Sequence, residues 1–163
     1  MGEVSKGSLF GRILKRKTPF RSEAHEASIA LMVSTSKLKW HLERAVNQEG
    51  ITSQQFNVLR ILRGACGPIA TMEVADRMID HHPGITKLMV RLERRGLIER
   101  NRSEEDSRKL MCSITEKGLR VLHQVDDEVV SIEETFFGYL SREKIQCLIE
   151  VLEQRHSRES ARS

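Results

Sequence analysis

Apolar side chains recur every three or four positions along most of the chain, and this period predicts a mainly helical fold. Several apolar segments begin directly after a residue that caps a helix well, as Ser22, Thr71, Thr115 and Ser141 do, and Thr52 with Gln55 matches a capping box. Glycine or proline residues end several of these segments, and Gly96 is expected to end the fourth helix. The expected helices cover about residues 23–48, 53–64, 72–78, 84–95, 116–136 and 142–155.

Two short segments follow a different pattern, in which apolar and polar residues alternate. They cover residues 97–100 and 110–114, and in the second Cys112 is expected to share a buried face with Leu110 and Ile114. The polar run 101–108 between them predicts a β-hairpin with a charged tip. The expected fold is therefore mainly α with one small β-hairpin.

The order of these elements predicts a winged helix-turn-helix over residues 50–115, with the hairpin as its wing. Four apolar residues of the helix at about 84–95 lie on one stripe that can face the core: Ile85, Leu88, Met89 and Leu92. The opposite side of the same helix then presents a largely basic set to the solvent: Gly84, Thr86, Lys87, Val90, Arg91, Arg94 and Arg95.

This outward set suits the major groove of duplex DNA. Lys87 and Arg91 can donate hydrogen bonds to guanine edges or to phosphate. Thr86 can donate or accept, and Val90 can contact a thymine methyl group. Gly84 permits close approach of the backbone. The alternative interpretation is an ordinary amphipathic helix with a solvated basic face.

The expected wing carries both signs of charge at its tip. Asp106 is expected to accept hydrogen bonds from the loop backbone or a nearby arginine, so that Arg108 can point into a narrow A·T-rich minor groove. The alternative is a charged turn that only keeps the hairpin soluble. The complete set of predicted DNA contacts is Thr71, Pro83, Gly84, Thr86, Lys87, Val90, Arg91, Arg94, Arg102, Asp106, Arg108 and Lys109.

Charge is unevenly distributed along the 163 residues, whose net charge is +4. Residues 1–21 alone sum to +5, so the rest of the chain is close to neutral, and any nucleic-acid contact there needs a segregated basic face. We predict a flexible basic arm over 1–21, either a solvated tail or a contact to DNA phosphate. A second flexible tail is expected over 157–163.

Composition excludes several other classes of protein. Three cysteines cannot form a disulfide framework, which fits a reducing cytoplasm, and no apolar run is long enough to span a membrane. No nucleophile elbow, phosphate loop or catalytic triad is present, so neither an enzyme nor a cofactor is expected. Of six histidines, His81 and His82 are adjacent and the other four are dispersed, so they do not form a metal-binding motif. Cys66 is the cysteine expected to be exposed. Cys112 is expected in the core, and Cys147 in the core or near a dimer axis.

Three motifs in this order resemble the MarR family of bacterial winged-helix regulators. They are Leu92-Glu93-Arg94-Arg95-Gly96-Leu97-Ile98-Glu99-Arg100, then Asp106 with Arg108, and then Ile114-Thr115 with Gly118. The resemblance covers about residues 22–156. Ser107 stands where an arginine is often found in this family, and the basic arm is an addition to the family's compact core.

The resemblance implies a homodimer in which residues 22–49 and 116–156 form the interface. It implies a repressor that binds a pseudo-palindromic operator through Thr86, Lys87 and Arg91, with Asp106 and Arg108 in the wing. It also implies release by a small aromatic or phenolic molecule in a pocket that Trp40 and His41 could border. Two alternatives stay open: an activator, and a winged-helix module that binds a protein partner.

Overall fold

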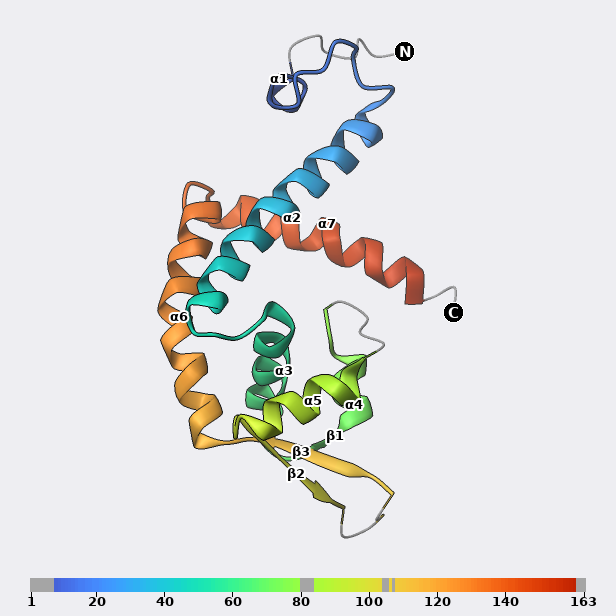
Figure 1. Cartoon of the computed structure of the whole chain (residues 1–163). Helices are drawn as coiled ribbons and strands as arrows, with labels where there is room; N and C mark the ends of the chain where they lie inside the picture. The colour runs from blue at the N-terminus through green and yellow to red at the C-terminus, as the bar shows by residue number, and fades with distance from the viewer. Residues whose placement is uncertain (1–7, 80–83, 104–105, 107, 161–163) are drawn as a thin grey trace. The chain divides into compact units, whose positions relative to one another are not determined.

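The computed structural model of the chain describes residues 8–79, 84–103, 106 and 108–160, with side chains as far as Gln154. It confirms the expected fold class, a mainly helical chain with one small antiparallel sheet (Figure 1). The chain divides into two compact units, residues 1–42 and 43–163. The long helix α2 (Glu23–Gln48) begins in the first unit and ends in the second.

The first unit contains a short helix that the sequence did not predict. This helix, α1 (Leu9–Ile13), is capped by the Ser8 hydroxyl, which accepts a backbone hydrogen bond at 3.0 Å. Phe20 is buried, the Arg16 guanidinium lies 4.6 Å from the centroid of its ring, and the His25 ring meets its edge. The segment predicted to be a flexible basic arm therefore contains a short helix and one buried aromatic side chain, that of Phe20.

The elements of the second unit that follow α2 are α3 (Ser53–Gly64), β1 (Ile69–Ala70), α4 (Thr71–Asp76), α5 (Ile85–Arg94), β2 (Ile98–Arg102), β3 (Leu110–Ile114), α6 (Glu116–Phe137) and α7 (Arg142–Ser160). This unit contains one hydrophobic core, to which α3, α5, β2, β3 and α6 contribute apolar side chains. Within it α3 packs against α6 and β3, and α5 packs against β2 and α4.

The sheet has the order β1-β3-β2, so the predicted hairpin gains a third strand. β1 was missed because two residues are too few to show alternation. Cys112 is buried opposite Ile69 and Arg100, as expected for the inner end of the wing. Leu110 was expected to share that buried face but is exposed, because it pairs with Arg102 at the outer end of the hairpin, beyond the core.

Three of the predicted helix caps are confirmed by side-chain hydrogen bonds. The Thr52 and Gln55 side chains form both bonds of the capping box, at 3.2 and 3.0 Å. The Ser22 hydroxyl accepts from the backbone N–H of His25 at 3.1 Å. The Thr115 hydroxyl accepts from the third residue of α6 at 3.1 Å.

The predicted cap at Thr71 is wrong. The N-cap of α4 is Ala70, and Thr71 is the first helical residue. The Thr71 hydroxyl instead donates to the Leu110 carbonyl at 3.3 Å and lies 3.2 Å from Cys112 Sγ. Thr71 therefore ties α4 to the wing.

The helix α7 differs from the sequence expectation in two respects. It continues to Ser160, into the segment 157–163 that was expected to be a flexible tail. Cys147 was expected in the core but is exposed, as are four apolar neighbours on the same helix: Leu148, Ile149, Val151 and Leu152. Within the described part of the chain, no helix combines the length and apolar character needed to cross a membrane.

Candidate nucleic-acid interface

The orientation of α5 follows from its apolar stripe. The four residues predicted to face inward are all at most 9% exposed and pack into the core: Ile85, Leu88, Met89 and Leu92. Because this stripe faces the core, the opposite side of the helix faces the solvent. Thr86, Lys87, Arg91 and Arg94 are exposed there, and Gly84 and Val90 are half-buried.

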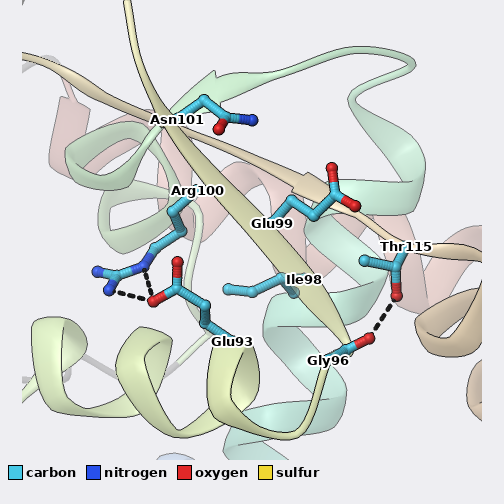
Figure 2. A pocket seen from close by; sticks show the side chains of 7 residues that line it. All are labelled: Glu93, Gly96, Ile98, Glu99, Arg100, Asn101 and Thr115. Atoms are coloured by element: carbon cyan, nitrogen blue, oxygen red, sulfur yellow. Dashed lines mark hydrogen bonds and ion pairs between the residues drawn. The ribbon is translucent and has the colours of Figure 1, made fainter.

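The one acidic residue of α5 is neutralised by a neighbouring strand. Glu93 receives two hydrogen bonds from the Arg100 guanidinium on β2, one of them from Nε at 3.0 Å (Figure 2). The Arg100 side chain is only 12% exposed, so this ion pair lies at the base of the wing. Three cations of α5, Lys87, Arg91 and Arg94, therefore dominate the charge of its outward side.

Asp106 accepts hydrogen bonds from the backbone of the wing loop, as predicted. Its Oδ1 accepts from the Arg108 backbone N–H at 3.1 Å, and its carbonyl accepts from the Lys109 N–H at 2.9 Å. The Asp106 N–H in turn donates to the Ser103 hydroxyl at 3.4 Å. Arg108, Lys109 and Arg102 are exposed around this turn. The structure thus places the predicted wing cations at the outer end of the hairpin.

Two of the predicted contacts stand apart from this arrangement. Pro83 lies outside the described residues, as does Ser107 in the wing. Thr71 is half-buried, and its hydroxyl is engaged with β3 as described above.

The residues predicted to border an effector pocket lie on α2 in the first unit. Trp40 is exposed, and its ring meets the His41 ring edge-on at 4.8 Å. A hollow of about 350 Å³ lies in the second unit, between the end of α5, β2 and Thr115 (Figure 2). Neither Trp40 nor His41 lines this hollow. Among the described residues, no group of three His, Cys, Asp or Glu side chains could hold a metal ion.

Sequence reasoning missed the bonds that hold the C-terminal end of α5. Arg95, expected to face outward with the DNA-contacting residues, donates through Nη1 to the Gly50 carbonyl at 2.8 Å. The Lys117 ammonium donates to the Arg95 carbonyl at 2.7 Å. The bonded residues are separated by 45 positions in the first contact and by 22 in the second. No local sequence pattern predicts contacts over such separations.

Comparison with known proteins points to one family. A family model described as the MarR family matches residues 49–109. A MarR transcription factor from Planctomyces limnophilus is 32% identical, with a TM-score of 0.63 over 83% of this chain and 98% of that chain. The homoprotocatechuate degradative operon repressor of Escherichia coli is 27% identical over 128 residues, 78% of this chain and 85% of the repressor. The fold also matches an E. coli MarR variant complexed with operator DNA, at 20% identity and a TM-score of 0.70, covering 91% of this chain and 98% of that one.

Proposed function

Because the chain belongs to the MarR family of DNA-binding transcriptional regulators, we propose that it is a cytoplasmic repressor that binds a pseudo-palindromic operator as a homodimer. The family consists of transcription regulators rather than enzymes, and the proposed role is regulatory, not catalytic.

The observation that carries this proposal is the division of α5 into two sides. A fully covered apolar side holds the helix in place, and an exposed side presents Lys87, Arg91 and Arg94, with the charge of Glu93 taken up by Arg100. A helix of this kind fits the major groove, where Lys and Arg donate to guanine or phosphate. We assign Thr86, Lys87 and Arg91 to base edges or nearby phosphates, and Arg94 to the phosphate backbone.

The wing supplies a second contact in this proposal. Arg108 enters the adjacent minor groove, and the bond from its N–H to Asp106 restrains the turn that carries it. Arg102 and Lys109 lie at the same end of the hairpin and contact phosphate. Four further residues complete the proposed contact set around the helix-turn-helix: Thr71, Pro83, Gly84 and Val90.

Dimerisation places two such helices in successive major grooves, about 34 Å apart. The proposed interface uses the helices at residues 22–49 and 116–156, on either side of the winged helix-turn-helix at 50–115. Its support is the exposed apolar surface of α7, because apolar side chains gathered on one helix surface favour contact with another protein.

A small aromatic or phenolic molecule is the proposed effector that releases the repressor. The E. coli relative is named for an operon that degrades homoprotocatechuate, an aromatic compound, which supports this class of ligand. Trp40 and His41 are proposed to border its site, since an exposed indole and an imidazole can stack on an aromatic ring.

The test is fluorescence anisotropy on a labelled duplex taken from upstream of the protein's own gene, with an unrelated duplex as control. We expect specific binding whose affinity falls steeply with salt, because bound phosphates release counterions. Lys87→Ala and Arg91→Ala should each cost about 1–3 kcal/mol if the residue contacts a base. Arg60→Ala, which removes an exposed arginine of α3 outside both the assigned contacts and the proposed dimer interface, is the matched control and should bind as wild type.

Two outcomes would contradict the proposal. Wild-type affinity in both α5 variants would reject the assigned binding mode. A folded dimer that fails to bind either duplex at low salt, with and without candidate aromatic effectors, would favour a module that binds a protein partner.

A further inference from the structure

Arg95 connects the end of α5 to the junction between α2 and α3. Its Nη1 donates to the Gly50 carbonyl at 2.8 Å and lies 3.5 Å from Gln55 Oε1. Gly50 follows the last turn of α2 and has a φ of +66°, a left-handed conformation that favours glycine. Gln55 is buried and its side chain already accepts from the Thr52 N–H in the capping box. The guanidinium therefore reaches two rigid acceptors.

The same end of α5 is also fastened to the start of α6. The Lys117 ammonium donates to the Arg95 carbonyl at 2.7 Å, and the Thr115 hydroxyl donates to the Gly96 carbonyl at 2.7 Å (Figure 2 shows the second bond). The Thr115 N–H donates to the Leu97 carbonyl at 3.1 Å. α5 thus ends between two helices that flank the winged helix-turn-helix in the chain.

The neighbouring arginines of this helix end differ in what they contact. Arg94 is exposed and lies on the outward side assigned above to phosphate. Arg95 is exposed as well, but its Nη1 donates to the Gly50 carbonyl, two residues beyond the end of α2. The guanidinium keeps its charge, because its acceptors are uncharged, but this bond directs the donor at the protein rather than at a phosphate.

We infer that Arg95 is a positioning residue, which sets the angle of the recognition helix α5 against the α2–α3 junction and makes no phosphate contact. The inference rests on the proposed DNA-binding function, and it goes beyond it by assigning opposite roles to two adjacent arginines. Since Gly50 lies two residues after α2 and Lys117 lies in the first turn of α6, a displacement of either helix end shifts the recognition helix through Arg95.

The adjacent arginines provide a matched experiment. The affinities of wild type, Arg94→Ala and Arg95→Ala for the same duplex are measured by anisotropy over a series of salt concentrations. Loss of one phosphate contact lowers the slope of log affinity against log salt by about 1, and this is the result expected for Arg94→Ala. For Arg95→Ala we expect an affinity about 2- to 30-fold lower with an unchanged slope.

A second readout, made without DNA, tests the positioning role directly. Hydrogen exchange of the backbone amides at residues 95–97 and 50–52 should become faster in Arg95→Ala and stay as in wild type in Arg94→Ala. If Arg95→Ala does not fold, Arg95→Lys replaces it, because lysine keeps the charge and one donor. Faster hydrogen exchange at the same residues is then expected, with a smaller increase in rate than for Arg95→Ala.

The outcomes separate this inference from the proposed function. If the wild-type protein binds the duplex, two results with Arg95→Ala would overturn the positioning role, namely a reduced salt slope or an unchanged affinity. Either result would leave the proposed DNA-binding function intact. Absence of salt-dependent binding by the wild-type protein would overturn both.

Discussion

α5 and α7 belong to the same compact unit, but they differ in what covers their apolar sides. The apolar stripe of α5 is at most 9% exposed, whereas the four apolar residues Leu148, Ile149, Val151 and Leu152 of α7 are 39–58% exposed. Among the described side chains, none of the buried residues that form the core comes from α7. The apolar side of α5 is therefore covered within one chain, whereas the apolar surface of α7 is not.

The difference indicates which part of the protein offers an apolar surface to a partner. Burying an apolar side chain stabilises a protein by about 1.5–3 kcal/mol, and α5 obtains this gain from its own chain. α7 can obtain it only from another surface. The proposed dimer would supply that surface without disturbing the orientation of α5, which its own core already determines.

The largest effect is expected from a charge in the apolar surface of α7. Leu148→Asp should abolish the dimer and with it operator binding, because one winged helix-turn-helix reaches only one half-site. The winged helix-turn-helix itself should stay folded, since Leu148 contributes nothing to its core. Sedimentation gives the mass, and circular dichroism with anisotropy gives fold and binding.

Gln146→Asp is the matched control for that variant. It places the same charge at an exposed polar position of α7 and should leave a dimer that binds DNA. A Leu148→Asp protein that remains dimeric would show that the exposed surface of α7 is not the interface.

An intermediate effect is expected from the same truncation on the two helices, made in the monomeric Leu148→Asp background. Leu92→Ala on α5 should lower the free energy of unfolding by about 2–5 kcal/mol, because it opens a cavity in the core. Leu152→Ala on α7 should lower it by less than about 1 kcal/mol, since this side chain is already 39% exposed. Urea denaturation measures the free energy of unfolding of both variants. An equal decrease in the two would contradict the view that the apolar side of α5 is covered in the single chain and that of α7 is not.

The smallest effect concerns the thiols of the two regions. Burial raises the pKa of Cys112 above its ordinary value of 9.0, although the hydrogen bond between Cys112 and Thr71 opposes the shift. The Cys112 thiol ionises at lower pH in the unfolded chain than in the folded protein, so alkaline pH favours the unfolded state. The contribution of the buried neutral thiol to stability is therefore complete below about pH 9 and is lost as pH rises further. Between pH 8 and 10, stability should fall less in Cys112→Ala than in wild type.

Cys147→Ala is the control for this pH dependence. Cys147 is exposed in the single chain, so its removal should leave the slope of stability against pH unchanged in the monomeric background. An equal change of slope in both variants would mean that Cys112 is not the buried thiol responsible.

Much of the candidate site could be predicted from local patterns in the sequence. The stripe of α5 has the period of a helix, so its buried and outward sides follow from spacing alone. Gly96 was predicted to end this helix and has a φ of +69°, a conformation that a side chain would strain. Asp106 was expected to order the wing turn because a short carboxylate bonds nearby backbone N–H groups.

The errors share a different cause. Thr71 has the residue type and position of an N-cap, but the Leu110 carbonyl, distant in sequence, takes its hydroxyl instead. Arg95 is exposed as predicted, but its guanidinium also donates to the Gly50 carbonyl, a contact that the spacing along α5 cannot reveal. Phe20 is buried in a segment that shows little apolar period.

The sequence by itself thus determined the helices, the capping box at Thr52, the inward side of α5 and the basic character of its outward side. These features depend on periodicity and on hydrogen bonds within a few residues, both of which are local. Only the tertiary structure decided which exposed cations also donate hydrogen bonds within the protein, as Arg95 does to the Gly50 carbonyl. That choice depends on acceptors brought close by folding, whose positions no local pattern specifies.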